Sequence, residues 1–292
     1  MIRSEKAVSE VIGMVLILGI MMLVIGAILL VGVPMIESGK ERARMDVAMG
    51  SFLSMQNDIE EVVQGPIWVK DPINETNVNM LGPARETEFE LMGGTLSVRP
   101  NTTNISQQLK TLNITNNKNF SIRIPPSNIM YTAGQETIIY ENGAVIRKYE
   151  AGVPMMVSNP LISIYKIDDN NITISIHAIS LNGTLSSVGG DGKAWIETRI
   201  VSYNQTISPN STIPNANNTY INITSAYPEA WKAFFDEKLN MSAGLALTNK
   251  SSTTGYNISG TRPLEVRIFG KKDNTPDILL SFYESRLDVK VR

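Results

Sequence analysis

The chain has 292 residues, which is enough for one anchoring helix and one large or two small domains. Its net charge of −2 and pI near 5.6 leave no basic field that could hold a nucleic acid. It has no cysteine, which excludes thiol catalysis, disulfides and cysteine-ligated metals, and its only histidine is His177, which excludes a cluster of histidine ligands.

An almost unbroken apolar run, VSEVIGMVLILGIMMLVIGAILLVGVPMI, occupies residues 8–36 behind the short polar leader MIRSEKA. The stretch between Glu10 and Glu37 carries no charge and would span roughly 39 Å as a helix, against roughly 30 Å for a hydrocarbon core. The run therefore predicts a membrane-spanning helix. A secretory signal is cut after its apolar core, but no small-residue cleavage site follows the core here.

The charged-to-apolar junction lies before the run, at Glu5-Lys6-Ala7-Val8-Ser9. This junction resembles the class III signal peptides of archaeal type IV pilin-like proteins, in which two charged residues and Gly or Ala precede the apolar helix. The resemblance covers about the first 65 residues, and the remainder is loosely similar to uncharacterised archaeal surface domains. It implies that a prepilin peptidase cuts between Ala7 and Val8, removes residues 1–7 and leaves the helix on the mature protein for assembly.

Glu10 is the one carboxylate inside the apolar run. An unpaired carboxylate in hydrocarbon costs several kcal/mol, so Glu10 needs either a partner or a place at the headgroup level. The new α-amino group of Val8, on the same or a neighbouring subunit, is one candidate partner. Bacterial type IV pilins, which the helix resembles, have such a glutamate at the fifth mature position, whereas Glu10 would be the third.

Small residues and one proline interrupt the run, and they are Gly13, Gly19, Gly26, Gly32 and Pro34. Gly19 and Gly26 are seven residues apart and share a face on which another helix could approach closely, although glycine is also simply common in membrane helices. Pro34 lacks an N–H group and predicts a kink.

Behind the kink, residues 38–64 show the periodicity of an amphipathic helix that ends at Gly65-Pro66. The apolar face comprises Ala43, Val47, Ala48, Phe52, Met55, Ile59, Val62 and Val63. We therefore expect one long helix from Ser9 to about Gln64 within residues 8–65, followed by a linker at 66–86. The amphipathic half needs a partner surface, and the following domain is the obvious one.

From residue 87 to 292 the period of alternation changes to two, which predicts strands. The expected strands are 89–92, 95–99, 112–115, 120–124, 137–140, 144–149, 161–167, 172–181, 194–203, 219–224, 264–269 and 278–291. Turn signals separate them, and Asn142-Gly143 is a strong hairpin signal. The fold class is therefore α+β, with a long N-terminal helix and an antiparallel β-sandwich or barrel-like domain.

Three further segments complete the β domain. A helix is expected around 228–239, and residues 240–262 are expected to form an exposed loop. The glycine-rich stretch Gly189–Lys193 fails as a phosphate-binding loop, because Ala194 stands where Ser or Thr must reach magnesium, so we interpret it as a hairpin turn.

The sequence contains 14 Asn-x-Ser/Thr sequons, where random placement of its Asn, Ser and Thr residues predicts about 4. They are Asn74, Asn101, Asn104, Asn113, Asn119, Asn171, Asn182, Asn204, Asn210, Asn217, Asn222, Asn240, Asn249 and Asn257. The excess indicates N-glycan acceptors on an external surface, with a turn-rich composition as the alternative. All of them follow the apolar run, which favours an inside N-terminus and an outside β domain.

No residue pattern indicates catalysis. His177 shares a strand face with Thr173 and Ser175, opposite Ile174 and Ile176, and we interpret it as a solvated strand position. No G-x-S-x-G motif surrounds a serine, and no carboxylate pair stands out. We therefore expect a protein without enzymatic activity, cofactor or metal.

The combined interpretation is a structural subunit of an archaeal type IV pilus-like filament. Its expected partners are identical subunits, the prepilin peptidase, the pilus assembly machinery and, before assembly, the cytoplasmic membrane. The glycosylated β domain would form the outer surface at the cell exterior and serve adhesion. The alternative is a singly anchored surface glycoprotein or adhesin that keeps the same helix in the membrane and never polymerises. An anchored secreted hydrolase has no residue in its favour.

Overall fold

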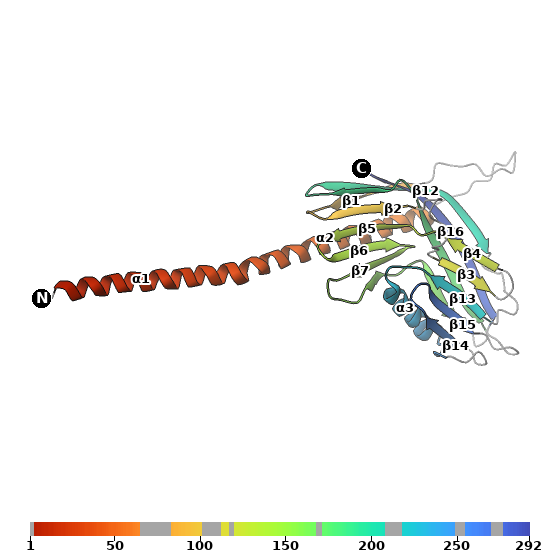
Figure 1. Cartoon of the computed structure of the whole chain (residues 1–292). Helices are drawn as coiled ribbons and strands as arrows, with labels where there is room; N and C mark the ends of the chain where they lie inside the picture. Colours follow the sequence, from red (N-terminus) through yellow and green to blue (C-terminus); the bar gives the residue numbers. More distant parts are fainter. Residues whose placement is uncertain are drawn as a thin grey trace. The chain divides into compact units, whose positions relative to one another are not determined.

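A computed structural model describes residues 3–64, 83–100, 112–116, 120–167, 171–207, 218–248, 255–269 and 277–292. The chain divides into two compact units, Met1–Asp46 and Val47–Arg292. An N-terminal helix is followed by a predominantly antiparallel β domain, as the sequence predicts (Figure 1).

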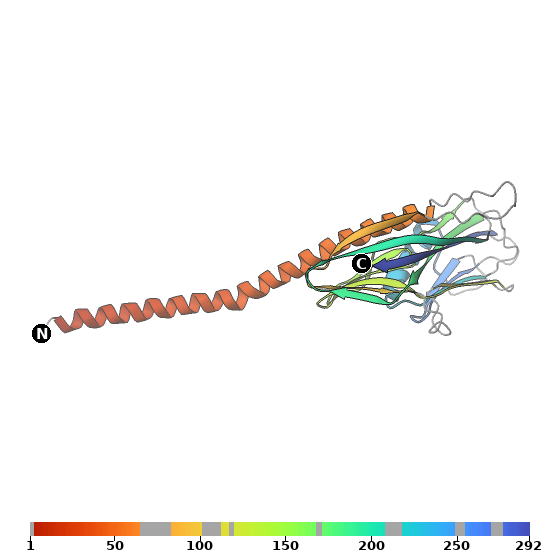
Figure 2. The same ribbon diagram turned by 90° about the horizontal axis from the view of Figure 1, so that it is seen from above.

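The N-terminal helix comprises α1 (Arg3–Ala27), a π-helical turn (Ile28–Gly32) and α2 (Val33–Gln64). It begins at Arg3, earlier than the expected Ser9. The π turn ends two residues before Pro34, whose ring would crowd the carbonyl group of Leu30 in a regular α-helix. The kink expected at Pro34 is therefore present as a widened helical turn. The helical ribbon bends within the unit Met1–Asp46 (Figure 2).

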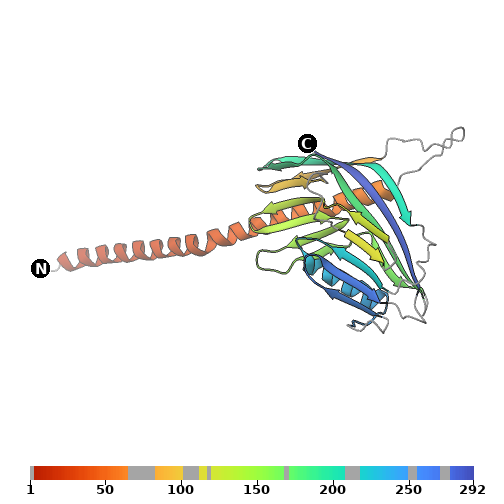
Figure 3. The same ribbon diagram turned by 45° about the vertical axis from the view of Figure 1, so that its right-hand side comes forward.

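The first sheet has the strand order β1 (Ala84–Glu90), β12 (Lys193–Ile207), β16 (Asp277–Val291), β10 (Asn171–Gly183) and β9 (Ile162–Lys166). Four of its strands were expected, and β1 begins before the expected 89–92 segment. β10 and β16 pair in parallel, which the expectation of an antiparallel domain did not include. The long strands β10, β12 and β16 curve together across the domain (Figure 3).

The second sheet has the order β11 (Ser186–Gly189), β2 (Thr95–Arg99), β5 (Asn128–Ala133), β6 (Glu136–Glu141), β7 (Ala144–Lys148) and β8 (Met155–Ser158). β11 pairs with β2, whereas β12 belongs to the first sheet. The hairpin interpretation of Gly189–Lys193 is therefore wrong, because this turn carries the chain from one sheet to the other.

The third sheet has the order β14 (Gly255–Ser259), β15 (Leu264–Phe269), β13 (Asn218–Ile223), β3 (Leu112–Asn116) and β4 (Phe120–Ile124). Helix α3 (Pro228–Glu237) and a π-helical turn (Lys238–Ser242) precede β14. The expectation of an exposed loop at 240–262 is wrong in part: residues 255–259 form β14, and Tyr256 and Ala243 are fully buried.

One core lies under the amphipathic part of α2. Phe52 of α2 meets Phe89 of β1 edge to face, with ring centroids 5.2 Å apart. The apolar face differs slightly from the expected one, because Val47 is 40% exposed whereas Met49 is buried. A second core joins all three sheets with α3, and its largest member is Trp231.

The predicted Asn142-Gly143 hairpin joins β6 and β7 and is itself buried. Both residues have positive φ angles, 48° and 87°, as a two-residue turn of this kind requires. The Asn142 side chain accepts a hydrogen bond from the Ile179 amide at 3.1 Å, and the Gln56 amide group donates to the Gly143 carbonyl at 2.8 Å. One turn thereby connects α2, β10 and the second sheet.

Glu141, directly before this turn, is a buried carboxylate. It accepts hydrogen bonds from the Ser225 hydroxyl and, at 2.6 Å, from the Trp231 indole N–H. Burial raises the pKa of Glu141 above its ordinary value, although both hydrogen bonds oppose the shift. The carboxyl group links β6 to α3.

Candidate functional surfaces

The first candidate surface is the apolar helix. Large apolar side chains from Ile12 to Ile36 are exposed by 42% at Val33 to 78% at Leu30. Among the described residues, one helix (Ile12–Gln64) is long and apolar enough to cross a membrane, and its most apolar window has a mean hydropathy of 3.1 with no burial. Such a surface is stable only in lipid or against other apolar surfaces.

The helix glycines are not required by contacts within the chain. A Cβ atom added at Gly13, Gly19 or Gly26 would meet nothing within 4 Å, and one at Gly32 would lie 3.7 Å from Cγ2 of Ile28, an ordinary contact. Contacts within the chain therefore do not explain why these positions are glycine. Close packing against the helix of another molecule is one explanation.

The residues of the expected cleavage junction, Lys6, Ala7 and Val8, lie within α1, as does Glu10. Their backbone is helical, and Pro34 lies at the second position of α2. The junction and the apolar run are therefore continuous parts of one helical element.

Six sequon asparagines have described side chains, and all six are at least partly exposed. Asn204 and Asn240 are exposed, whereas the side chains of Asn171, Asn182, Asn222 and Asn257 are half-buried. Asn113 lies on β3, directly opposite Asn222 in the antiparallel register. The remaining sequons, Asn74, Asn101, Asn104, Asn119, Asn210, Asn217 and Asn249, lie outside the described residues.

His177 is not the solvated residue that the sequence suggested. It is on the expected strand face, but it is half-buried, and its Nε2 atom lies 2.8 Å from the hydroxyl of the fully buried Ser285. The rings of Tyr203 and Tyr283 each lie 5.9 Å from its ring. Burial lowers the pKa of His177 to about 4, so the imidazole is neutral at physiological pH.

A shallow groove of about 390 Å³ opens beside this histidine. The side chains of α2, β9, β10 and β16 contribute to it, among them Gln64, Ser163, Ser175, His177 and Tyr283. The sequence gives no sign of this groove, because its wall depends on the parallel pairing that places Tyr283 beside His177.

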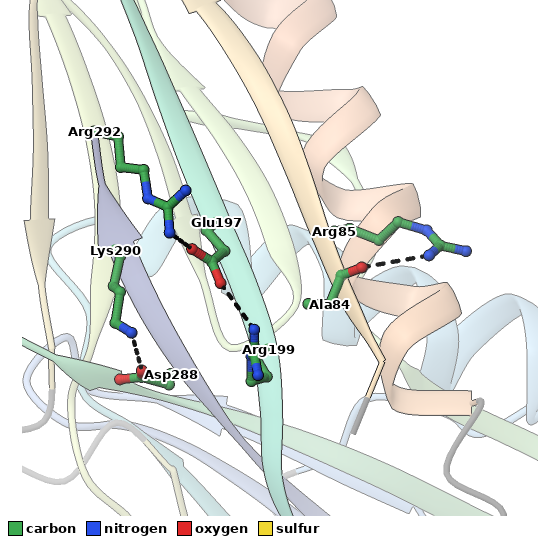
Figure 4. A network of polar contacts seen from close by, with 7 residues as sticks. All are labelled: Ala84, Arg85, Glu197, Arg199, Asp288, Lys290 and Arg292. Carbon is green, nitrogen blue, oxygen red and sulfur yellow. Dashed lines mark hydrogen bonds and ion pairs between the residues drawn. The ribbon is translucent and has the colours of Figure 1, made fainter. Parts of the chain in front are cut away.

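A charged network covers part of the first sheet (Figure 4). Glu197 of β12 binds Arg199 at 3.3 Å and Arg292 at 2.6 Å, and Lys290 lies 3.5 Å from Asp288. The arginine and lysine members are exposed by 41–62%, so each pair contributes at most about 1 kcal/mol. Figure 4 also shows Arg85 of β1 donating to the Ala84 carbonyl at 3.4 Å.

The part of the chain that the structure describes holds no group of three or more His, Asp or Glu side chains that could bind a metal ion. Ser285 is fully buried beneath His177, which leaves the serine–histidine pair without an accessible nucleophile.

Residues 71–267 match the model of DUF7289, described as a family of unknown function. No curated protein and no solved structure shows significant similarity to the chain.

Proposed function

The chain belongs to the DUF7289 family, whose function is unknown, and from its own residues we propose that it is a structural subunit of an extracellular type IV pilus-like filament. The observation that carries the proposal is the exposed apolar surface from Ile12 to Ile36. A bundle of identical helices buries such a surface on all sides once it has left the membrane.

Two sequence features support a filament in particular. The junction Glu5-Lys6-Ala7-Val8-Ser9 resembles archaeal class III signal peptides, which are cut before the apolar helix. Gly19 and Gly26, which share a helix face, have open space at Cβ, so a neighbouring helix could approach closely there. The β domain, with its sequons, then forms the outer surface of the filament and serves adhesion.

The proposed subunit is not an enzyme and carries no cofactor or metal. Its partners are identical subunits, a prepilin peptidase, the assembly machinery and the cytoplasmic membrane before assembly. Glu10 sits near the new N-terminus at Val8, where the α-amino group offers a cation for its carboxylate.

N-terminal sequencing of protein sheared from the cell surface tests the proposal. Filaments seen by electron microscopy should contain a chain that begins at Val8. Ala7→Leu should leave an uncut precursor in the membrane and no filaments, because the peptidase reads a small residue there. Ser4→Ala, outside the junction, is the matched control and should assemble normally.

The same experiment identifies the alternative. Surface protein that keeps Met1, with no filaments in wild-type cells, would contradict the proposal and indicate a singly anchored surface glycoprotein. Normal filaments from Ala7→Leu would show that the junction is not the processing site.

A further inference from the structure

The groove beside His177 has a chemical character that the proposed assembly role does not use. All of its lining residues belong to the unit Val47–Arg292, and none belongs to the apolar run. Inferences about it are therefore independent of whether the chain forms filaments.

Its polar groups can both donate and accept hydrogen bonds. Gln64 ends α2 and is exposed, Ser163 is exposed on β9, and Ser175 is half-buried opposite it on β10. An amide and two hydroxyl groups thus face one opening, and each hydroxyl can serve as donor or acceptor.

The aromatic side chains that line the groove are fixed by contacts with neighbouring residues. The Tyr283 ring stacks on Tyr203, with centroids 5.9 Å apart and an interplanar angle of 30°. His177 contacts both rings and is fixed by its 2.8 Å contact with Ser285. The wall is therefore preorganised, which reduces the entropy lost when a ligand binds.

The described residues that line the groove include no acidic side chain, lysine or arginine. An anionic ligand would find no cation there, and a purely apolar ligand would leave the amide and hydroxyl groups without partners. The remaining class is an uncharged ligand that has many hydroxyl groups and one apolar face, which is the chemistry of a neutral sugar ring.

We propose that this groove binds a neutral hexopyranose unit, with the apolar face of the sugar on Tyr283 and its hydroxyl groups on Gln64, Ser163 and Ser175. The sugar comes either from the chain's own N-glycans or from another surface.

Saturation-transfer NMR on the full chain tests the proposal, with the methyl glycosides of glucose, galactose and mannose as probes. The protein is kept in a zwitterionic detergent, because glucoside and maltoside detergents would occupy the groove. At least one neutral glycoside should receive saturation, with a Kd of about 1 mM. Glucuronate, which has the same ring but a charge, should bind about tenfold more weakly or not at all.

Variants separate the groove from the rest of the surface. Tyr283→Ala should weaken binding about tenfold or more, whereas Tyr283→Phe keeps the ring and should bind nearly as well as wild type. Gln64→Leu changes only an exposed helix-end residue and should weaken binding several-fold with an unchanged Tm. Tyr149→Ala, an exposed tyrosine outside the groove, is the matched control.

Two preparations distinguish the sources of the sugar. The first is protein purified from its native host. If it binds the probes only after its N-glycans are removed, those glycans are the occupant of the groove. Equal binding before and after removal would identify sugar from another surface. Saturation of no neutral glycoside in either preparation, or equal binding by wild type, Gln64→Leu and Tyr283→Ala, would overturn the proposal.

Discussion

At the residue scale, the fold removes two ionisable side chains partly or fully from water, and stability depends on pH in opposite directions for the two. His177 lies among tyrosines on the first sheet, and Glu141 lies between β6 and α3. Burial disfavours the charged form of each, which lowers the pKa of the histidine and raises the pKa of the carboxyl group.

His177 should make the β domain sensitive to acid. Its folded pKa of about 4 lies below the ordinary value of 6.5, so between these values the unfolded chain binds a proton that the folded chain does not. The stability of wild type should therefore fall from about pH 6.5 to pH 4, by up to about 3 kcal/mol. Thermal unfolding of wild type and His177→Gln across this range measures the effect. Parallel pH curves for the two proteins would contradict it.

Glu141 should have the opposite effect at higher pH. Because its folded pKa is raised above 4.5, its contribution is fully present below pH 4.5 and is lost as the pH rises through the folded pKa. Glu141→Gln remains neutral, so its Tm relative to wild type should increase from pH 4 to pH 8.

A second substitution at this position is the control. Glu141→Ala leaves the Trp231 indole N–H without its acceptor and should destabilise by about 1–3 kcal/mol at pH 4 in the same unfolding series, where the contribution of the carboxyl group is fully present. A constant Tm difference between wild type and Glu141→Gln would show that the carboxyl group does not titrate in this range.

At the scale of elements, the register of the third sheet limits glycosylation. Asn113 on β3 and Asn222 on β13 are directly opposed in the antiparallel register, and directly opposed positions are close neighbours across two such strands. Two sugar rings attached there would collide, so we expect at most one of these sequons to be filled in any one molecule.

Glycopeptide mass spectrometry of Asn222→Gln from the native host tests this expectation. Occupancy of Asn113 should rise in the variant, because the competing site is gone. Asn240→Gln, which removes an exposed sequon on a different element, should leave Asn113 unchanged. High occupancy of both asparagines in wild type would contradict the expectation.

Alternation of apolar and polar residues predicts most of the strands. It fails where a strand is short or lies in a stretch of mostly polar residues. β8 and β11 have four residues each, too few to show a period, and β14 lies in a stretch rich in Ser, Thr and Asn. β5 alternates clearly, with Ile129 and Tyr131 buried, yet it was not among the expected strands.

Of the two candidate sites, the sequence predicts the apolar helix and does not predict the groove. The apolar helix is visible in the sequence because hydropathy is a local property, and its exposure in the structure agrees. The groove depends on Tyr283, Tyr203 and His177, which come from three strands far apart in the chain. Strand order between distant segments is not encoded in any local pattern, so sequence reasoning placed His177 in solvent.

At the scale of the whole molecule, the apolar helix should tolerate no charge at its centre. Leu23 is 72% exposed within the apolar run, and Leu23→Lys would place an ammonium group in lipid or in a dry helix bundle, at a cost of about 2.5 kcal/mol or more. We expect loss of filaments with a β domain that still folds.

Electron microscopy of sheared material, with immunoblotting of the membrane fraction, measures this outcome. Leu23→Met is the matched control and should assemble at the wild-type yield. A wild-type yield of filaments from Leu23→Lys would show that this helix does not form the fibre core.

The parallel pairing of β16 has a consequence for biogenesis. β16 lies between β12 and β10, and the strands β11 to β15 separate it from β10 along the chain. Ribosomes deliver the chain from its N-terminus, so β10 and β12 are made well before the strand that joins them. Until β16 arrives, both present an open edge, the kind of surface on which nascent chains aggregate. A chaperone that covers these edges until β16 is made would therefore protect the yield of folded protein.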